Sequence, residues 1–129
     1  FKFQCSTDGG SNYNLTITST YFRSTHDESG SSGAVAYQAS QDQGNGTSFQ
    51  NISQSVGNDN DQSGAGFLHL FDPSNTTFVK HFLARTNNAH QSDKTRDVFT
   101  AGYFNTTSAI NAIQFKMSAG NIDSGVIKM

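Results

Sequence analysis

The chain has 129 residues, which suits one domain with a real core, and only 14% of them are charged, while Ser, Thr, Asn, Gln and Gly are abundant. Its formal net charge of -2 supplies no broad basic field for phosphates or anionic lipids, so we expect neither nucleic-acid nor membrane partners. Eleven Phe and four Tyr argue against disorder, and the single cysteine excludes an intrachain disulfide.

Strand-like alternation begins at the first residue. Phe1, Phe3 and Cys5 share one parity and are predicted to share one sheet face. A second strand is predicted over residues 13–25, where apolar side chains alternate with threonines. We expect the threonines to face water, because Thr suits the solvent side of a strand.

The middle of the chain predicts a long loop followed by a hairpin. A short strand is predicted over 34–39, and residues 40–63 form a polar loop with a strand near 49–56. The apolar run 67–71 ends at a turn and predicts a strand, and its partner is predicted over 76–86. Both faces of that partner carry apolar residues, so we expect it near the sheet centre with both sides partly covered.

The last third predicts a polar loop over 87–95 and then a strand over 97–104. We interpret the apolar alternation of this strand as Phe99, Ala101 and Tyr103. Alternation resumes over 113–117, and residues 126–129 begin a final strand.

Strands at this spacing, without a helical period between them, predict an all-β fold: an antiparallel β-sandwich, jelly-roll-like, of seven to nine strands. Because both ends lie in strand-like patterns, we expect one domain over residues 1–129 that is truncated at both ends. The predicted core consists of Phe3, Leu15, Ile17, Leu68, Leu70, Phe82, Ile113, Phe115 and Met117.

No catalytic signature is present. Cys5 lies on the apolar parity of a strand, which is typical of a small core residue rather than an activated thiolate. G-x-S-x-G, Walker and H-E-x-x-H motifs do not occur. The Asp and Glu residues lie mainly in turn-like segments, which favours a turn-forming role. We therefore predict a protein that is not an enzyme and needs no cofactor.

Two segments carry candidate metal ligands. His26, Asp27 and Glu28 are adjacent, but adjacent strand residues point to opposite faces. The weak calcium candidates are Asn58, Asp59, Asn60 and Asp61. They lack the D-x-D-x-D-G spacing with a terminal Glu, so a polar turn is favoured over a calcium site.

Two histidines lie in the best-defined predicted strands. His69 and His81 could pair across the intervening turn, with zinc binding or pH sensing as possible consequences. We favour half-buried histidines, each satisfied by a neighbouring group.

Several segments resemble a known family: Phe3 to Tyr13, His69 to Ser74, Val79 to Phe82, Ala101 to Tyr103, Thr107 to Ile110, Phe115 to Ser118 and Ile127 to Met129. They are similar to small structural proteins of marine tailed bacteriophages, including cyanophages. The resemblance implies a virion component. A polar, Thr- and Asn-rich sandwich suits the exterior of the particle, as a fibre module, tail accessory or capsid decoration. The resemblance also implies further strand residues at both ends.

The leading hypothesis is therefore a virion surface domain that contributes structure and host-surface binding. Expected partners are other copies of the chain, as a trimer or another homo-oligomer, other virion proteins and host surface glycans. An alternative is a carbohydrate-binding module that stacks sugars on Tyr37 or Tyr103, although Trp, the strongest platform, is absent. A polysaccharide depolymerase is the third hypothesis and the least supported, because no clustered carboxylates are evident.

Overall fold

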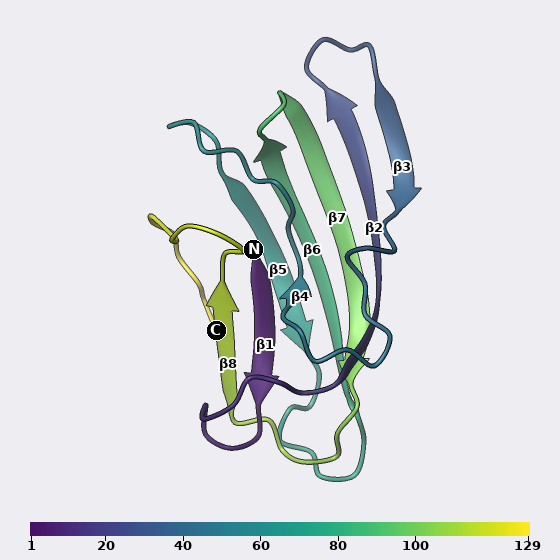
Figure 1. Ribbon diagram of the computed structural model, residues 1–129, viewed down its shortest axis with the longest axis vertical. Helices are drawn as coiled ribbons and strands as arrows, with labels where there is room; N and C mark the ends of the chain where they lie inside the picture. Colours follow the sequence, from purple (N-terminus) through teal and green to yellow (C-terminus); the bar gives the residue numbers. More distant parts are fainter.

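The computed structural model describes residues 1–129 as an all-β sandwich of eight strands in two antiparallel sheets (Figure 1). The small sheet has the order β4 (Gln50–Asn51), β1 (Lys2–Ser6) and β8 (Ala112–Lys116). The large sheet has the order β3 (Gly33–Tyr37), β2 (Ile17–Asp27), β7 (Lys94–Phe104), β6 (Lys80–His90) and β5 (Gly64–Leu70). The predicted sandwich and strand number are confirmed.

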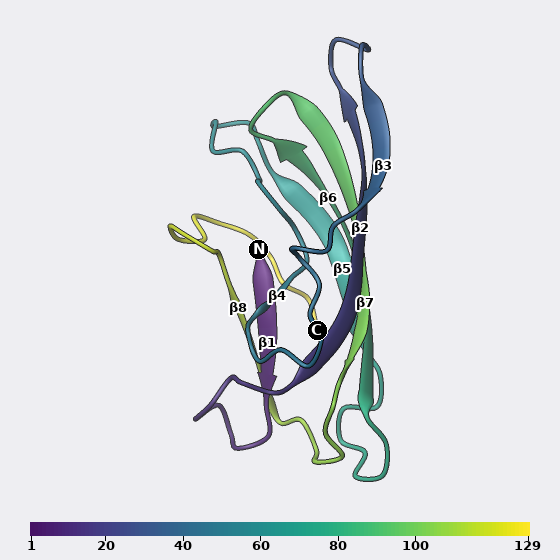
Figure 2. The ribbon, with the colours of Figure 1, turned by 45° about the vertical axis from the view of Figure 1, so that its right-hand side comes forward.

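Strand pairing explains how the two sheets are joined. β1 pairs with β8 and β2 pairs with β7, so the chain enters and leaves the large sheet through adjacent strands, as in a jelly roll. The remaining strands depart from that pattern, because β5, β6 and β7 form a meander and β3 pairs only with β2. Figure 2 shows the small sheet facing the lower part of the large sheet, whose strands continue above it.

The apolar half of the sandwich lies where the two sheets face each other. Phe3 of β1 meets Phe82 and Phe104 edge-on, with ring centroids 5.1 and 5.8 Å apart. Such edge-to-face contacts add to the stabilisation from apolar burial. The fully packed cluster comprises Phe3, Cys5, Ile17, Ile52, Phe82, Ala84 and Phe104.

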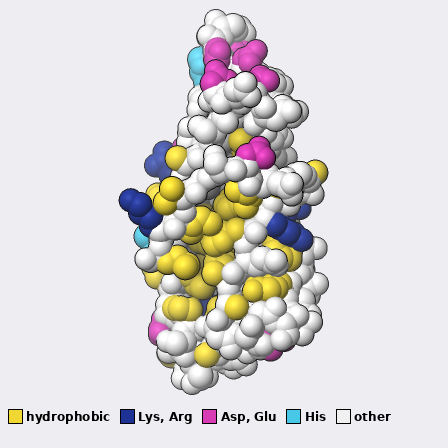
Figure 3. All heavy atoms as spheres, turned by 90° about the vertical axis from the view of Figure 1, so that its left-hand side faces the viewer, with side chains coloured by type: hydrophobic (Ala, Val, Ile, Leu, Met, Phe, Trp, Pro, Cys, Tyr) yellow, Lys and Arg dark blue, Asp and Glu magenta, His cyan; other side chains and the backbone are white.

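The predicted core residues lie in the right region, but only three of the nine are fully buried. Phe3, Ile17 and Phe82 are fully buried. Five others only partly cover this cluster, namely Leu15, Leu68, Leu70, Ile113 and Phe115. Met117 is half-buried and lies outside the cluster. Figure 3 shows hydrophobic side chains gathered on the side of the molecule that carries the β5 and β8 edges.

Polar residues continue the inner face of the large sheet beyond this cluster. We call this region, together with the chain that covers it, the polar half. Its buried members on the large sheet are Ser19, Thr86, Asn88, His90, Arg96 and Thr100, and those on the covering chain are Gln50 and Ser53. The sheet residues lie mainly under the chain between β3 and β5 rather than under the small sheet. The predicted polar loop over 87–95 is therefore wrong, because β6 and β7 run through it and turn only at 91–93. Asp93, with a φ of 51°, closes that turn.

The buried faces of β6 and β7 also differ from those predicted. β6 buries Lys80, Phe82 and Ala84 on one face and exposes the other, so its two sides are not both covered. β7 buries Val98 and Phe104 inward. The residues predicted as its apolar face, Phe99, Ala101 and Tyr103, point outward. Residues 126–129 form no strand and are exposed, which corrects the predicted final strand.

Candidate functional site

The outer face of the large sheet, turned away from the small sheet, is unusually aromatic. Its side chains form three cross-strand rows. The first contains Thr18, Tyr103, His81 and, at the end of β5, Phe71. The second contains Thr20, Ala101, Leu83 and His69. The third contains Tyr37, Phe22, Phe99, Arg85 and Phe67.

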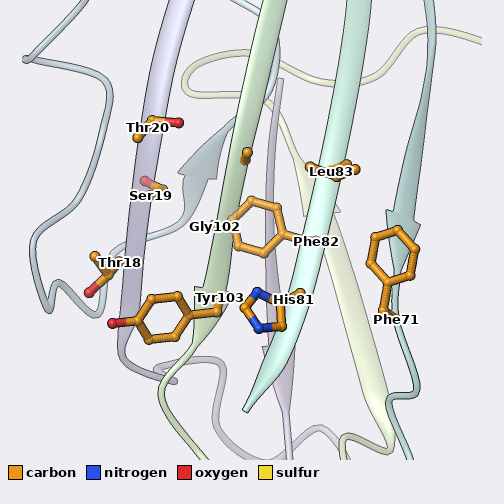
Figure 4. Close-up of a pocket in the computed structure, with 10 residues that line it drawn as sticks. Thr18, Ser19, Thr20, Phe71, His81, Phe82, Leu83, Gly102 and Tyr103 are labelled. Carbon is orange, nitrogen blue, oxygen red and sulfur yellow. The ribbon is translucent and has the colours of Figure 1, made fainter.

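A hollow opens over the second row because the side chain of Ala101 is small and the side chains around it are larger. It measures about 400 Å³, within the range of small-ligand pockets, and is open to solvent. Figure 4 shows Tyr103 leaning toward Thr18, with His81 on its other side and Phe71 at the far end. The hollow therefore combines aromatic walls with hydroxyl and imidazole groups.

Gly102 forms the floor of the hollow. A Cβ at this position would lie 2.5 Å from the Thr18 carbonyl oxygen and 2.8 Å from the Phe82 ring. Only glycine lets β2, β7 and the core phenylalanine approach this closely. The shape of the hollow thus depends on packing beneath it.

A stacked pair occupies the third row, outside the residues that line the hollow. The rings of Phe22 and Phe99 are 4.8 Å apart and nearly parallel, and the Arg85 guanidinium lies 4.7 Å from the Phe99 ring centroid. Asp97 accepts hydrogen bonds from two nitrogens of Arg85, the shorter at 2.8 Å, and raises the pKa of that guanidinium. Both faces of Phe99 are therefore covered, so its ring offers no free stacking surface.

The exposed edge strand β5 adds a row of rings along the chain. His69 lies between Phe67 and Phe71, with ring centroids 5.0 and 6.3 Å away. The two phenylalanines are 52% and 48% exposed. Apolar rings this exposed on a sheet edge are a typical interaction surface.

The two predicted ligand-binding tyrosines share this face but not one site. Tyr103 lines the hollow and lies 5.9 Å from His81, centroid to centroid. Tyr37 lies on β3 opposite Phe22, and its hydroxyl donates to the Asp42 carboxylate, a bond that raises the pKa of the tyrosine. Only Tyr103 is placed to contact a molecule in the hollow.

Sequence reasoning missed most of this face. It did not single out Phe22, Phe67, Phe71, Leu83 or Phe99 as surface residues. The available signal was the opposite parity of β7, where Val98, Thr100, Gly102 and Phe104 can form the inner face. Choosing between the two parities requires knowing which one faces the small sheet.

The predicted histidine pair is not formed. His69 is opposite Leu83 in the β5·β6 register, and His81 is opposite Tyr103 in the β6·β7 register. Both histidines are exposed rather than half-buried. They lie on the same outer face, and His81 contributes to the hollow.

The metal candidates occupy exposed turns. Asn58, Asp59, Asn60 and Asp61 are all exposed. The Asp27 carboxylate accepts hydrogen bonds from Ser31 and Ser32, which lower its pKa to about 2. No group of three or more His, Cys, Asp or Glu side chains comes together in the structure.

Cys5 is fully buried in the core, as its strand parity predicted. Burial raises the pKa of its thiol to about 12. The reactive thiolate is therefore strongly disfavoured at neutral pH.

Comparisons with known proteins add no relative. No family model, curated protein or solved structure matches this chain. The structure also contains no helix of the length and apolar character needed to cross a membrane.

Proposed function

We propose that this domain is a non-enzymatic surface module whose outer-face hollow binds a sugar ring, and that it serves on the exterior of a bacteriophage particle. The observation that carries the binding role is the hollow around Ala101, where Tyr103, His81 and two threonines converge. The virion setting rests on the sequence resemblance alone. Other copies of the chain and other virion proteins are its proposed partners.

The chemistry of the hollow suits a pyranose. A sugar ring has an apolar face of C–H groups, which packs on an aromatic ring such as Tyr103. Its hydroxyl rim needs both donors and acceptors, and the Thr20 hydroxyl can provide both, whereas the Thr18 hydroxyl is already bonded to Asn45. Each contact contributes little free energy in water, so one domain should bind weakly and an oligomer much better.

The lining residues favour binding over hydrolysis. None of the ten is Asp or Glu. Glycoside hydrolysis canonically requires two carboxylates flanking the scissile bond. The outer-face carboxylate of Asp97 is engaged by Arg85. We therefore propose a binding module and not a polysaccharide depolymerase.

A second candidate function is supported by Phe67 and Phe71. Their exposed rings, on edge strand β5 and directly after it, fit an assembly contact with another copy or another virion protein. Phe71 also lines the hollow, whereas Phe67 does not, so a contact centred on Phe67 is compatible with glycan binding.

The glycan proposal is tested with the biotinylated domain, free and clustered on streptavidin. Both forms are screened by biolayer interferometry against neutral and acidic bacterial surface polysaccharides, with a parallel assay for released reducing ends. We expect the clustered form to bind at least one polymer, and Tyr103→Ala to weaken that binding about tenfold. The matched control Tyr37→Ala, on the same face but outside the hollow, should change it less than about twofold.

Three outcomes would count against the proposal. Absence of binding by the clustered form across the panel would remove the glycan role, and equal losses for the two tyrosine variants would remove the hollow as its site. Release of sugar ends by pure protein would show an enzyme. The assembly role is tested separately by light scattering, where Phe67→Ser should lower the oligomer mass and leave glycan binding per domain unchanged.

A further inference from the structure

Two arginines converge beneath the segment that follows β4, on the inner face of the large sheet. Arg23 of β2 donates to the Gln54 side-chain oxygen at 2.5 Å. Arg96 of β7 donates to the Gln54 main-chain oxygen at 3.1 Å and to its side-chain oxygen at 3.4 Å. Both guanidinium groups therefore lie around a single neutral residue.

The positive charge at this place is not balanced. Arg96 is only 5% exposed, and its Nε has no hydrogen-bond partner. The only ion pair in the structure joins Arg85 to Asp97 on the opposite face of the sheet. Burial and the neighbouring Arg23 both lower the pKa of Arg96. His90 and Lys94 belong to the same electropositive region, because the pKa of His90 is lowered by burial and by the nearby cations.

A second unpartnered donor lies close by. The Tyr21 hydroxyl is buried without a partner and is close enough to both arginines for their charges to affect its pKa. Burial is the larger effect and raises that pKa to about 12, so the hydroxyl keeps its proton. The unsatisfied atoms here, Arg96 Nε and Tyr21 Oη, are both able to donate.

The unpaired donors and the uncompensated positive charge together favour an anion as the ligand. A buried guanidinium without a counter-ion is costly, because water no longer solvates its charge. We propose that Arg23, Arg96 and Tyr21 form a binding site for a small inorganic anion, a halide or an oxyanion such as phosphate. A cation would be repelled. A neutral water would satisfy hydrogen bonds but leave the charge uncompensated.

The covering chain limits the size of the ligand. Ile52 and Ser53, directly before Gln54, are buried at 3% and 6% exposure. Ser53 is held by a hydrogen bond from its hydroxyl to Asn88. The site is thus closed by an anchored segment, and we infer a structural ion that stabilises the native state rather than a group on a polymer. It is independent of the outer-face hollow.

The experiment measures thermal unfolding of the purified domain at constant ionic strength. Potassium gluconate, whose anion is too bulky for the closed site, is replaced stepwise by potassium chloride or potassium phosphate. Specific binding gives a saturable rise in Tm, of about 4 °C or more at concentrations well above Kd. Calorimetric titration with inorganic phosphate and with chloride shows which ion binds.

Variants separate the site from general salt effects. Arg96→Met removes the buried charge at similar length and should abolish the saturable rise, and Arg23→Gln should weaken the anion's apparent affinity. Arg85→Gln, on the outer face, should respond like the wild type. The proposal is overturned if wild type and Arg96→Met show the same anion dependence, or if the wild type shows no saturable response. If Arg96→Met does not fold, the comparison of Arg23→Gln with Arg85→Gln decides in the same way.

Discussion

The apolar half and the polar half of the inner face are built on the same three long strands, β2, β6 and β7, yet they are packed in different ways. Below, Phe82 and Phe104 meet Phe3 from the small sheet. Above, Asn88 and Arg96 are just as buried but meet the irregular chain that contains β4. The difference lies in what covers each half.

A covering sheet satisfies its own backbone, whereas a covering loop does not. β1 pairs along its length with β8, so only side chains need to fit against it. Main-chain oxygens in the covering loop instead need donors from elsewhere. Inner-face side chains supply them: Thr86 donates to the Ile52 oxygen and Arg96 to the Gln54 oxygen. Buried polarity here is the consequence of an irregular cover.

The largest effect should come from the apolar half. Phe82→Ala removes a fully buried ring that contacts Phe3 and Phe104, and should lower the free energy of unfolding by about 3 to 5 kcal/mol. Denaturant titration measures it. Phe115→Ala is the matched control, because that ring is only partly buried and should cost less. Equal losses of unfolding free energy for the two variants would show that a ring at the centre of the cluster contributes no more stability than a ring at its border.

In the polar half, replacing a buried amide by an apolar side chain of similar size should destabilise the protein. Gln50 is fully buried, accepts from the Ser19 hydroxyl at 2.7 Å, and donates to the main-chain oxygens of Gln41 and Asn51. Gln50→Leu leaves these groups without a partner, and we expect a loss of about 2 kcal/mol or more in the same titration. Unchanged stability would mean that apolar packing can replace the network, and the contrast between the halves would disappear.

This contrast also explains what could be predicted from the sequence. The sandwich follows from period-two alternation, and strands such as Phe67–Phe71 stood out because their apolar run ends at a strong turn. The β6·β7 turn was missed because Asn88, His90 and Arg96 are buried polar residues, which resemble a loop in sequence. Asn88 and Arg96 find partners in Ser53 and Gln54, 34 to 42 positions away, which no local pattern reveals.

Of the residues that line the hollow, only Tyr103 was predicted from the sequence to bind a ligand. Tyr103 was proposed for its exposed ring, although the strand interpretation placed its parity on the apolar face. The hollow depends on Ala101 lying between taller side chains of neighbouring strands, Thr20 and Leu83. Cross-strand register decides that arrangement, and register was not available from the sequence.

A smaller effect tests a single bond to the covering loop. Thr86 is buried and its hydroxyl donates to the Ile52 oxygen, so Thr86→Val keeps the shape and removes one hydrogen bond. We expect a loss of about 1 kcal/mol in denaturant titration. Thr100→Val is the control, because the Thr100 hydroxyl is 3.5 Å from the Asn51 oxygen, at the limit of a hydrogen bond. A larger loss for Thr100→Val would contradict this account.

The smallest effect is a pH dependence that arises from His90 in the polar half. Burial, followed by the charges of Arg96, Lys94 and Arg23, lowers the pKa of His90 below its ordinary value of 6.5. Its Nδ1 also accepts a hydrogen bond from the Ser92 amide at 3.0 Å, which requires that nitrogen to carry no proton. The unfolded chain therefore binds the proton more tightly, so stability is full above about pH 6.5 and falls as the pH drops toward the native pKa. Thermal unfolding between pH 7.5 and 5 should show this slope, and His90→Gln should reduce it, whereas His26→Gln, an exposed residue at the tip of β2, should leave it unchanged. The remaining slope in His90→Gln belongs to the amino terminus of Phe1, whose pKa is also lowered by burial. An undiminished slope in His90→Gln would place the titrating group elsewhere and leave the polar half without its own pH response.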